Sequence, residues 1–172
     1  MCGFFMDKRI QTLVKHLELL PHPEGGFYKE TYRSEGSIAK NALNGFKGDR
    51  NFSTAIYFLL TSENFSSLHR IKQDELWHFY EGSALNVHII HPNGNYEVLE
   101  IGNQIEKGEQ YQAWVPAGAW FGATVKDQNS YSLVGCTVAP GFDFEDFELA
   151  KKEELLKLFP QHSEIISKLC RI

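Results

Sequence analysis

The sequence has no apolar run long enough to cross a lipid bilayer. In a chain of 172 residues, the longest such run covers residues 55–60 (AIYFLL), far short of the roughly 20 residues that a membrane helix needs. Residues 1–6 are apolar, but the stretch is too short, and has too few basic residues before it, for a secretory signal. We therefore expect no membrane association and a cytoplasmic location.

Basic clusters and paired cysteines are also scarce. Seventeen Lys and Arg against 22 Asp and Glu give a net charge of −5 and a pI near 5.8, so no nucleic-acid partner is expected. The three cysteines, at positions 2, 136 and 170, are widely spaced and fit neither a disulfide framework nor a zinc motif. We interpret them as reduced thiols, with Cys136 buried and inert.

Hydrophobic residues make up 42% of the chain and aromatic residues 13%, enough to build the core of a single domain over residues 1–172. Apolar residues recur at helical spacing over residues 7–20, with Asp7 placed to cap the helix. Residues 27–33 alternate like a strand, and residues 34–50 are expected to form a long surface loop.

A series of short strands follows, separated by glycine-containing turns. We expect these strands at residues 53–60, 65–71, 75–80, 84–90, 95–101, 111–115, 121–125 and 130–138. Asn93 and Gly94 indicate a hairpin turn. Helical spacing returns over residues 146–169, with a break at Pro160 and Ser163 as the next cap. This pattern predicts an all-β sandwich or barrel, with its core in residues 27–140 and a helix at each end.

The stretch 67–82 holds the densest set of residues with useful chemistry. Strand alternation places Ser67 and His69 on one face of a strand, and Glu75 and Trp77 on one face of the next. A turn between these strands would lay them side by side. His69 and Glu75 are therefore expected to point into one cavity.

This stretch resembles the first motif of the cupin superfamily, which reads H-x-H, three or four residues, E, six residues, G. Glu75 and the glycine that follows it fit the second half, and His69 fits the second histidine, although five residues separate it from Glu75. Ser67 stands where the first histidine would be. The second cupin motif, P-x-G-x-x-H, reads PAGAWF here, so Phe121 replaces its histidine.

Further blocks resemble the uncharacterised cupin-5 family. They are PHPEGGFY at 21–28, TYRS at 31–34, TAIYFLL at 54–60, DELWHF at 74–79, VPAG at 115–118 and GCTVAPGFDF at 135–144. The resemblance implies a single cupin jelly-roll barrel with short terminal helices, and commonly a homodimer. We expect such a dimer to exchange the segment around residues 27–33, which would cover an exposed sheet edge. The resemblance implies no established reaction.

A metal-dependent cupin typically holds its ion with three histidines and a carboxylate, ligands that suit Fe, Mn, Ni or Zn. Here only His69 and Glu75 match, because serine and phenylalanine occupy the other two positions. His78 alternates away from Glu75, while His88 is an open candidate for a third ligand. We therefore expect no cofactor, with a divalent transition metal held by His69 and Glu75 as the alternative.

Acid–base chemistry is the other use of a histidine and a carboxylate, since such a pair can move protons near neutral pH. Metal-free cupins related to the dTDP-sugar 3,5-epimerases use a pocket histidine as base, and residues 67–69 resemble the strand that carries it. His69 would then be the base and Glu75 its partner or a second acid. The structural alternative is a hydrogen-bonded barrel histidine, with Glu75 as its buried partner or that of Arg70.

Several side chains are expected to surround a small molecule in the barrel, because such pockets are mostly apolar with a few polar anchors. The residues expected to contact it are Glu30, Tyr57, Ser67, Trp77 and Phe121. Ordinary core packing is the alternative for the aromatic ones, and an exposed sheet edge for Glu30. Asp143 is expected to cap a turn instead.

Together these features favour a small-molecule-binding cupin that acts as a metal-independent isomerase- or epimerase-like enzyme on a small polar or sugar-derived compound. A non-catalytic cupin that binds or senses a ligand is the first alternative. A metal-dependent oxygenase or isomerase with an incomplete ligand set is the second, because one fold supports many functions.

Overall fold

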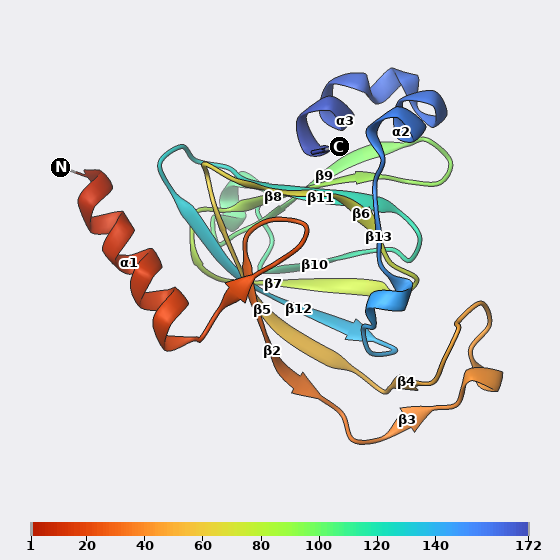
Figure 1. The fold of residues 1–172 in the computed structure, drawn as a ribbon. Helices are drawn as coiled ribbons and strands as arrows, with labels where there is room; N and C mark the ends of the chain where they lie inside the picture. The colour runs from red at the N-terminus through yellow and green to blue at the C-terminus, as the bar shows by residue number, and fades with distance from the viewer. Residues whose placement is uncertain (1, 172) are drawn as a thin grey trace.

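Two antiparallel β-sheets pack face to face in the computed structural model of the chain and form a jelly-roll-like sandwich (Figure 1). The structure describes residues 2–171, and the side chains of residues 8–171. No helix in this range is both long and apolar enough to cross a membrane. The predicted all-β class with terminal helices is confirmed, although the two sheets form an open sandwich rather than a closed barrel.

The first sheet has six strands in the order β1-β2-β5-β12-β7-β10. Their bounds are β1 Leu20–Pro21, β2 Phe27–Arg33, β5 Thr54–Thr61, β7 Asp74–Gly82, β10 Gln112–Val115 and β12 Tyr131–Ala139. Strand β2 pairs with β1 on one side and with β5 on the other, all within one chain. The predicted exchange of residues 27–33 between two copies stays a prediction.

The second sheet has five strands in the order β13-β6-β11-β8-β9. Their bounds are β6 Phe65–Arg70, β8 Leu85–Ile90, β9 Tyr96–Ile101, β11 Trp120–Val125 and β13 Glu148–Leu149. The predicted turn at Asn93–Gly94 lies in the hairpin that joins β8 to β9, where Gly94 has φ +86°. The left-handed conformation suits glycine, so this part of the prediction is confirmed.

The main core lies between the sheets, because inward-facing residues alternate along most of the strands. Trp77 and Phe58 from the first sheet meet Phe121 and Ile89 from the second, and all four are at most 2% exposed. Burial of each such side chain stabilises the fold by about 1.5–3 kcal/mol. Phe58 and Trp77 of this core also line a cavity between the sheets.

The terminal helices cover the outer faces of the two sheets. Helix α1 (Cys2–His16) packs Leu13 against Leu59 and Leu133 of the first sheet. It begins and ends earlier than the predicted range 7–20, so Asp7 lies inside the helix and does not cap it. The side chain of Cys2 lies outside the described residues.

The predicted helical region 146–169 contains β13, then α2 (Lys152–Leu158) and α3 (Ser163–Leu169), which pack on the outside of the second sheet. Pro160 separates the two helices as expected, because it begins the short 3₁₀ helix η4 (Pro160–His162). The cap of α3 is His162, one residue before the predicted Ser163. Cys136 and Cys170 are free, as predicted; Cys136 is buried, also as predicted, and so is Cys170.

The expected loop at 34–50 carries some regular structure of its own. A small hairpin joins β3 (Ser37–Ile38) to β4 (Arg50–Asn51) and encloses the 3₁₀ helix η1 (Lys40–Ala42). A second such helix, η2 (Ile105–Lys107), lies between β9 and β10, and a third, η3 (Phe144–Asp146), follows β12. Asp143 caps η3 by accepting a hydrogen bond from the backbone N–H of Glu145 at 2.8 Å, which confirms its predicted role.

A β-bulge in β6 changes which residues face the core. His69 pairs with Phe121 of β11, but Ala123 pairs with Ser66, so Ser67 and Leu68 together lie opposite a single residue. Ser67 therefore leaves the face that His69 occupies, and its hydroxyl accepts a hydrogen bond from Arg171 at 3.0 Å. The predicted shared face of Ser67 and His69 is wrong for this reason.

Candidate functional site

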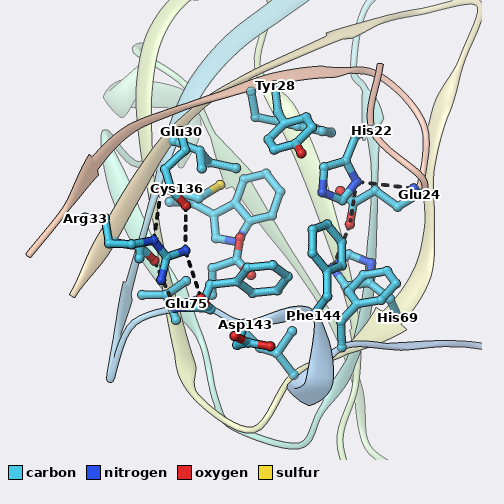
Figure 2. A pocket seen from close by; sticks show the side chains of 18 residues that line it. His22, Glu24, Tyr28, Glu30, Arg33, His69, Glu75, Cys136, Asp143 and Phe144 are labelled. Atoms are coloured by element: carbon cyan, nitrogen blue, oxygen red, sulfur yellow. Dashed lines mark hydrogen bonds and ion pairs between the residues drawn. The ribbon is translucent and has the colours of Figure 1, made fainter. Parts of the chain in front are cut away.

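A cavity of about 410 Å³ opens between the two sheets, at the end where β5 and β7 begin and β2 and β12 finish (Figure 2). Its wall contains His22 and Glu24; Tyr28, Glu30 and Arg33; Thr54, Ile56 and Phe58; His69 and Ile71; Glu75 and Trp77; Cys136 and Val138; and Phe142, Asp143, Phe144 and Phe147. Most of these residues are apolar or aromatic, with a few convergent polar groups. This is the usual composition of a small-molecule site.

The turn between β1 and β2 brings Glu24 into the wall of this cavity. The backbone N–H of Gly25 donates to the His22 carbonyl at 3.0 Å, and Gly25 and Gly26 have φ of +113° and +75°. A Cβ atom at Gly25 would overlap the carbonyl oxygen of Phe65, so only glycine lets the turn lie against β6. The turn therefore fixes Glu24 beside β6.

Glu24 and His69 form a buried ion pair. His69 Nε2 lies 3.0 Å from Glu24 Oε2, and His69 Nδ1 lies 2.7 Å from the carbonyl oxygen of Ser67. The Ser67 carbonyl oxygen can only accept, and so can the Glu24 carboxylate while its pKa is held low, so both ring nitrogens carry a proton and the ring is an imidazolium. The Ser66 hydroxyl donates a hydrogen bond to the other carboxylate oxygen, Glu24 Oε1, at 2.8 Å.

The pair keeps both charges despite its burial. Burial opposes the charge on His69, but the Glu24 carboxylate outweighs this and raises the His69 pKa above its ordinary value. Burial would likewise raise the pKa of Glu24, but His69 outweighs it and holds that pKa below the usual range. At neutral pH, Glu24 is therefore an anion and His69 a cation.

Glu75 has the opposite electrostatic environment. Its side chain lines the cavity, is 8% exposed, and has the Cys136 thiol as its hydrogen-bonding neighbour. Burial and the nearby Glu24 carboxylate raise its pKa to about 7, although His69 partly opposes them. The same surroundings hold the pKa of the Cys136 thiol well above its usual value, through burial first and Glu75 second. The cavity thus contains a carboxyl group that can both donate and accept a proton near neutral pH.

His22 is the neutral member of the cluster. Its Nδ1 accepts a hydrogen bond from the backbone N–H of Glu24 at 3.2 Å, so its proton is on Nε2. Burial lowers the His22 pKa and keeps the ring uncharged. The ring packs edge-on against Tyr28 at a centroid distance of 4.6 Å and stacks with Phe144 at 6.3 Å.

The segment after β12 places three phenylalanines in the cavity wall. Phe142 and Phe144 meet edge to face at 5.0 Å, and Phe147 stacks on His69 at 5.2 Å. Below them, Asp146 receives two hydrogen bonds from the Arg50 guanidinium, at 2.7 and 2.9 Å. Both side chains are at most 3% exposed, so this pair holds the segment in place.

Comparison with known proteins shows which family the chain belongs to. Residues 11–150 match the family described as "Cupin superfamily (DUF985)", also called Cupin_5. The chain belongs to the Cupin_5 family. The uncharacterised protein YML079W of Saccharomyces cerevisiae is 30% identical to this Cupin_5 chain over 157 residues, which is 86% of this chain and 78% of the yeast protein.

Solved structures agree with this assignment. A hypothetical protein from Leishmania major has a TM-score of 0.85 at 38% identity, with 93% of this chain and 97% of that one covered. Protein SO0799 of Shewanella oneidensis has a TM-score of 0.85 at 40% identity, with 94% and 96% covered. Oxalate decarboxylase from Bacillus subtilis is similar in fold alone, at a TM-score of 0.54 and 16% identity, covering 87% of this chain and 36% of that one.

Four of the seven residues predicted for the site line the cavity of this Cupin_5 protein: Glu30, His69, Glu75 and Trp77. The other three, Tyr57, Ser67 and Phe121, are not part of its wall. Tyr57 packs on the opposite face of the first sheet, edge to face with Tyr80 at 5.8 Å. Phe121 lies in the core behind the wall, with its ring 4.1 Å from that of His69. The structure corrects the predictions for these three residues.

The two remaining histidines of interest point away from the cavity. His78 lies on the outer face of the first sheet and contacts the Thr137 hydroxyl at 3.1 Å, as expected from alternation. His88 lies on the outer face of the second sheet, 3.0 Å from Thr124 Oγ1 and 2.7 Å from the Tyr96 hydroxyl. Burial lowers the His88 pKa to about 4. His88 therefore does not supply the third metal ligand, a role for which strand alternation had left it an open candidate.

The residues present do not fit the metal site of a metal-dependent cupin. Within residues 8–171, no group of three or more His, Cys, Asp or Glu side chains is arranged to hold an ion. His69 Nε2, the atom that would bind a metal, already donates to Glu24, and Phe121 lies beside it without a donor atom.

Sequence reasoning missed Glu24, His22 and Arg33 as parts of the site. Their signal was present in two of the blocks that resemble the family: the block at 21–28 joins His22 and Glu24 to two glycines, and the block at 31–34 contains Arg33. Alternation along strands could not place them, because Glu24 and His22 lie in a turn. Glu75, the predicted partner of His69, lines the same cavity. The carboxylate that contacts the His69 ring directly is that of Glu24.

Proposed function

We propose that this Cupin_5 protein is a metal-independent, isomerase-like enzyme that moves a proton within a small carbonyl compound. The observation that carries the proposal is the position of Glu75. Its carboxyl group lies in the cavity wall, bonded to no cation among residues 8–171, with a pKa of about 7. A general acid–base group works best when its pKa lies near the operating pH.

His69 has a different role from the base expected from the sequence. Both of its ring protons are donated to fixed oxygens, so the ring has no free lone pair with which to accept a proton. As a fixed cation in the wall it can stabilise negative charge that develops on a substrate oxygen. Glu24 is the positioning residue that keeps this ring charged and oriented.

The reaction then needs only groups that the cavity contains. The Glu75 carboxylate takes a proton from the carbon next to the substrate carbonyl, and the C–H electron pair forms the C=C bond of an enolate. The negative charge on the enolate oxygen is stabilised by the His69 imidazolium. In a compound with a hydroxyl on that carbon, the hydroxyl proton passes to the enolate oxygen and gives an enediolate. Protonated Glu75 then returns its proton to the former carbonyl carbon, where the C=C electron pair forms the new C–H bond. The second oxygen forms the new C=O bond, so the carbonyl moves by one position and the enzyme is restored. The aromatic wall limits water at the reacting carbon.

Solvent isotope exchange tests this proposal without knowledge of the natural substrate. The purified protein is incubated in D₂O with a panel of aldoses, ketoses and amino sugars, and loss of carbon-bound hydrogen is followed by proton NMR. We expect catalysed exchange next to the carbonyl of at least one compound. Glu75→Gln should slow this exchange by about 10²–10⁴-fold, the usual contribution of a general acid–base group.

Glu97→Gln is the matched control. Glu97 is an exposed glutamate that pairs with His91 at 2.6 Å on the outside of the second sheet, so the variant should exchange like the wild type. The proposal fails if Glu75→Gln exchanges as fast as the wild type, or if no compound of the panel exchanges.

A non-catalytic ligand-binding cupin is the second candidate, and one observation favours it. The wall is largely aromatic, and the indole N–H of Trp77 has no acceptor among the described residues. A ligand that supplies that acceptor would bind without any reaction. Retained ligand binding by both wild type and Glu75→Gln, with no exchange by either, would support this candidate. The homodimer and the cytoplasmic location stay predictions.

A further inference from the structure

The fixed cations of the cavity are already neutralised by carboxylates. The N–H groups at Nε and Nη2 of Arg33 donate hydrogen bonds to the two carboxylate oxygens of Glu30, at 2.9 and 2.7 Å. The N–H group at Nη1 donates to the side-chain oxygen of Asn51 at 2.8 Å. On the other side of the cavity, His69 donates to Glu24 at 3.0 Å. Figure 2 shows these two pairs facing each other across the open space. Each cation is balanced by a carboxylate, so neither pair gives the cavity a net positive charge.

Two further carboxyl groups in the wall form no ion pair of this kind, although Arg33 and Arg50 lie near enough to Asp143 to interact with it electrostatically. Asp143 accepts a backbone N–H from Glu145 at 2.8 Å, and Glu75 has the Cys136 thiol as its neighbour. Within residues 8–171, neither forms an ion pair with a Lys, Arg or His. When both are ionised the wall therefore has an excess of negative charge, which a positively charged ligand would balance and an anion would increase.

Aromatic rings surround the same space. Phe142, Phe144 and Tyr28 line the cavity together with Trp77, and Phe142 and Phe144 lie on the same segment as Asp143. Ring faces attract organic cations, and the attraction grows when the cation loses its water shell. A carboxylate beside aromatic rings is a common arrangement for binding substituted ammonium groups.

The wall also holds one buried donor without an acceptor. The Nε1 atom of Trp77, a residue only 2% exposed, has no hydrogen-bond partner among the described residues. Leaving a buried donor unpaired is unfavourable, so a ligand that carries a carbonyl or hydroxyl oxygen gains when the indole shifts to bring this N–H to it. The ligand expected from the wall therefore combines a cation with an uncharged acceptor.

We propose that the cavity binds small organic ammonium compounds that also carry a carbonyl or hydroxyl group, and that it rejects phosphorylated and carboxylated ones. This inference rests on the proposed function and names its substrate class. Asp143 and Glu75 would balance the ammonium charge, the aromatic rings would surround it, and Trp77 would donate to the oxygen. Nucleotide sugars, with their phosphates, do not fit such a wall.

Three probes of equal shape and different charge test this directly. Phenethylamine, 2-phenylethanol and phenylacetate are titrated at pH 8 by calorimetry, and their effect on the melting temperature is recorded at millimolar concentration. We expect the amine to bind about tenfold more tightly than the alcohol. Phenylacetate should cause no shift. Any other order, including absence of binding by all three, overturns the proposal.

Asp143→Asn removes the negative charge of this side chain and keeps its shape. Asparagine keeps an oxygen that can cap η3, so the segment should stay folded, and unchanged affinity for 2-phenylethanol would confirm this. The variant should lose most of the preference for the amine over the alcohol, whereas Glu97→Gln should keep it. If Asp143→Asn and wild type show the same preference, Asp143 does not contribute to recognition and the proposal is wrong.

The pH dependence gives a second readout. The charged or titratable groups around Glu75 are His69 from β6, Glu24 from the turn before β2 and Cys136 from β12. A cation bound near Glu75 favours its ionised form, so binding of phenethylamine should release a proton and strengthen between pH 6 and pH 8. The affinity of Glu75→Gln should show much less change over this range.

The outcomes distinguish this proposal from the proposed function. If the amine is not preferred while deuterium exchange persists, the substrate class is wrong and the proton transfer stands. If the amine is preferred but no compound exchanges, the cavity is a binding site for ammonium compounds and the proposed enzyme activity fails.

Discussion

His69 donates one ring proton to Glu24 and the other to the carbonyl of Ser67, at 3.0 and 2.7 Å. Glu24 lies in a glycine-containing turn and His69 in a bulged strand, and both are at most 5% exposed. A buried pair of this kind contributes little net stability, but loss of one partner leaves an uncompensated charge. The site therefore depends on the turn at 22–26 as much as on the sheets.

Glu24→Gln should destabilise the protein strongly. The variant leaves His69 buried without its anion, and such changes typically cost about 3–5 kcal/mol. The exposed pair His91–Glu97 provides a matched control, because Glu97→Gln should change the free energy of unfolding by less than about 1 kcal/mol. Urea unfolding at pH 7 measures both. Equal effects of the two substitutions would show that burial of the Glu24–His69 pair does not matter.

The same pair defines a pH window. Glu24 has a lowered pKa in the folded state, so its stabilising effect is present above its unfolded value near 4.5 and is lost as the pH falls through the folded pKa. His69 has a raised pKa, so its contribution is complete below 6.5 and is lost as the pH rises through the folded pKa. NMR titration of the His69 ring should show this raised pKa, and Glu24→Gln should lower it.

Glu75→Gln should stabilise the protein in alkaline solution. The folded state keeps the Glu75 proton up to a pKa of about 7, whereas the unfolded chain loses it near 4.5, so stability falls as the pH rises between these values. Removing the carboxyl should add about 3 kcal/mol above pH 7.5 and little below pH 4.5. Thermal unfolding of both proteins from pH 4 to pH 9 measures the difference. A variant equally or less stable at pH 8 would contradict the raised pKa.

Much of the fold could be predicted from the sequence because strands and turns are local. Alternation of apolar residues indicated every strand of the two sheets from β5 to β12 to within a few residues. It also placed Glu75 and Trp77 inward and His78 outward, since β7 is regular where these residues lie.

The rest depended on features that alternation does not contain. The bulge in β6 moved Ser67 off the inner face, and no residue type in that strand marks a bulge. Tyr57 lies on the face that helix α1 covers, and the sequence does not state which face of a strand meets a cavity. Glu24 reaches His69 through tertiary packing of a turn, which spacing along the chain cannot predict.

Gly25→Ala should disrupt the site from outside it. Gly25 has φ +113°, and an added Cβ would overlap the carbonyl oxygen of Phe65, so the turn that carries Glu24 must move. Gly45 is the matched control, because it has φ +82° but no atom within 4 Å of its Cβ position. We expect Gly45→Ala to cost about 1 kcal/mol and Gly25→Ala clearly more, by thermal unfolding. Loss of the raised His69 pKa in Gly25→Ala alone would confirm that the turn positions Glu24.

Phe121→His should give the protein a metal site. The ring of Phe121 lies 4.1 Å from that of His69, and Glu24 is 3.0 Å from His69 Nε2, so an imidazole at position 121 adds a third ligand beside a histidine and a carboxylate. Two histidines and a carboxylate are a common ligand set for zinc, and binding to the folded state raises the melting temperature. We expect Zn²⁺ to raise the melting temperature of Phe121→His relative to the same variant in EDTA.

The wild type is the control for that experiment. Its melting temperature should be the same with Zn²⁺ and with EDTA, because Phe121 has no donor atom and His69 Nε2 is bonded to Glu24. Glu24→Gln in the Phe121→His background should reduce the zinc effect, since it removes the carboxylate ligand. A zinc-dependent increase as large in the wild type as in the variant would show that this cavity binds metal through other residues, and the proton transfer assigned to Glu75 would then have to be tested with the metal bound.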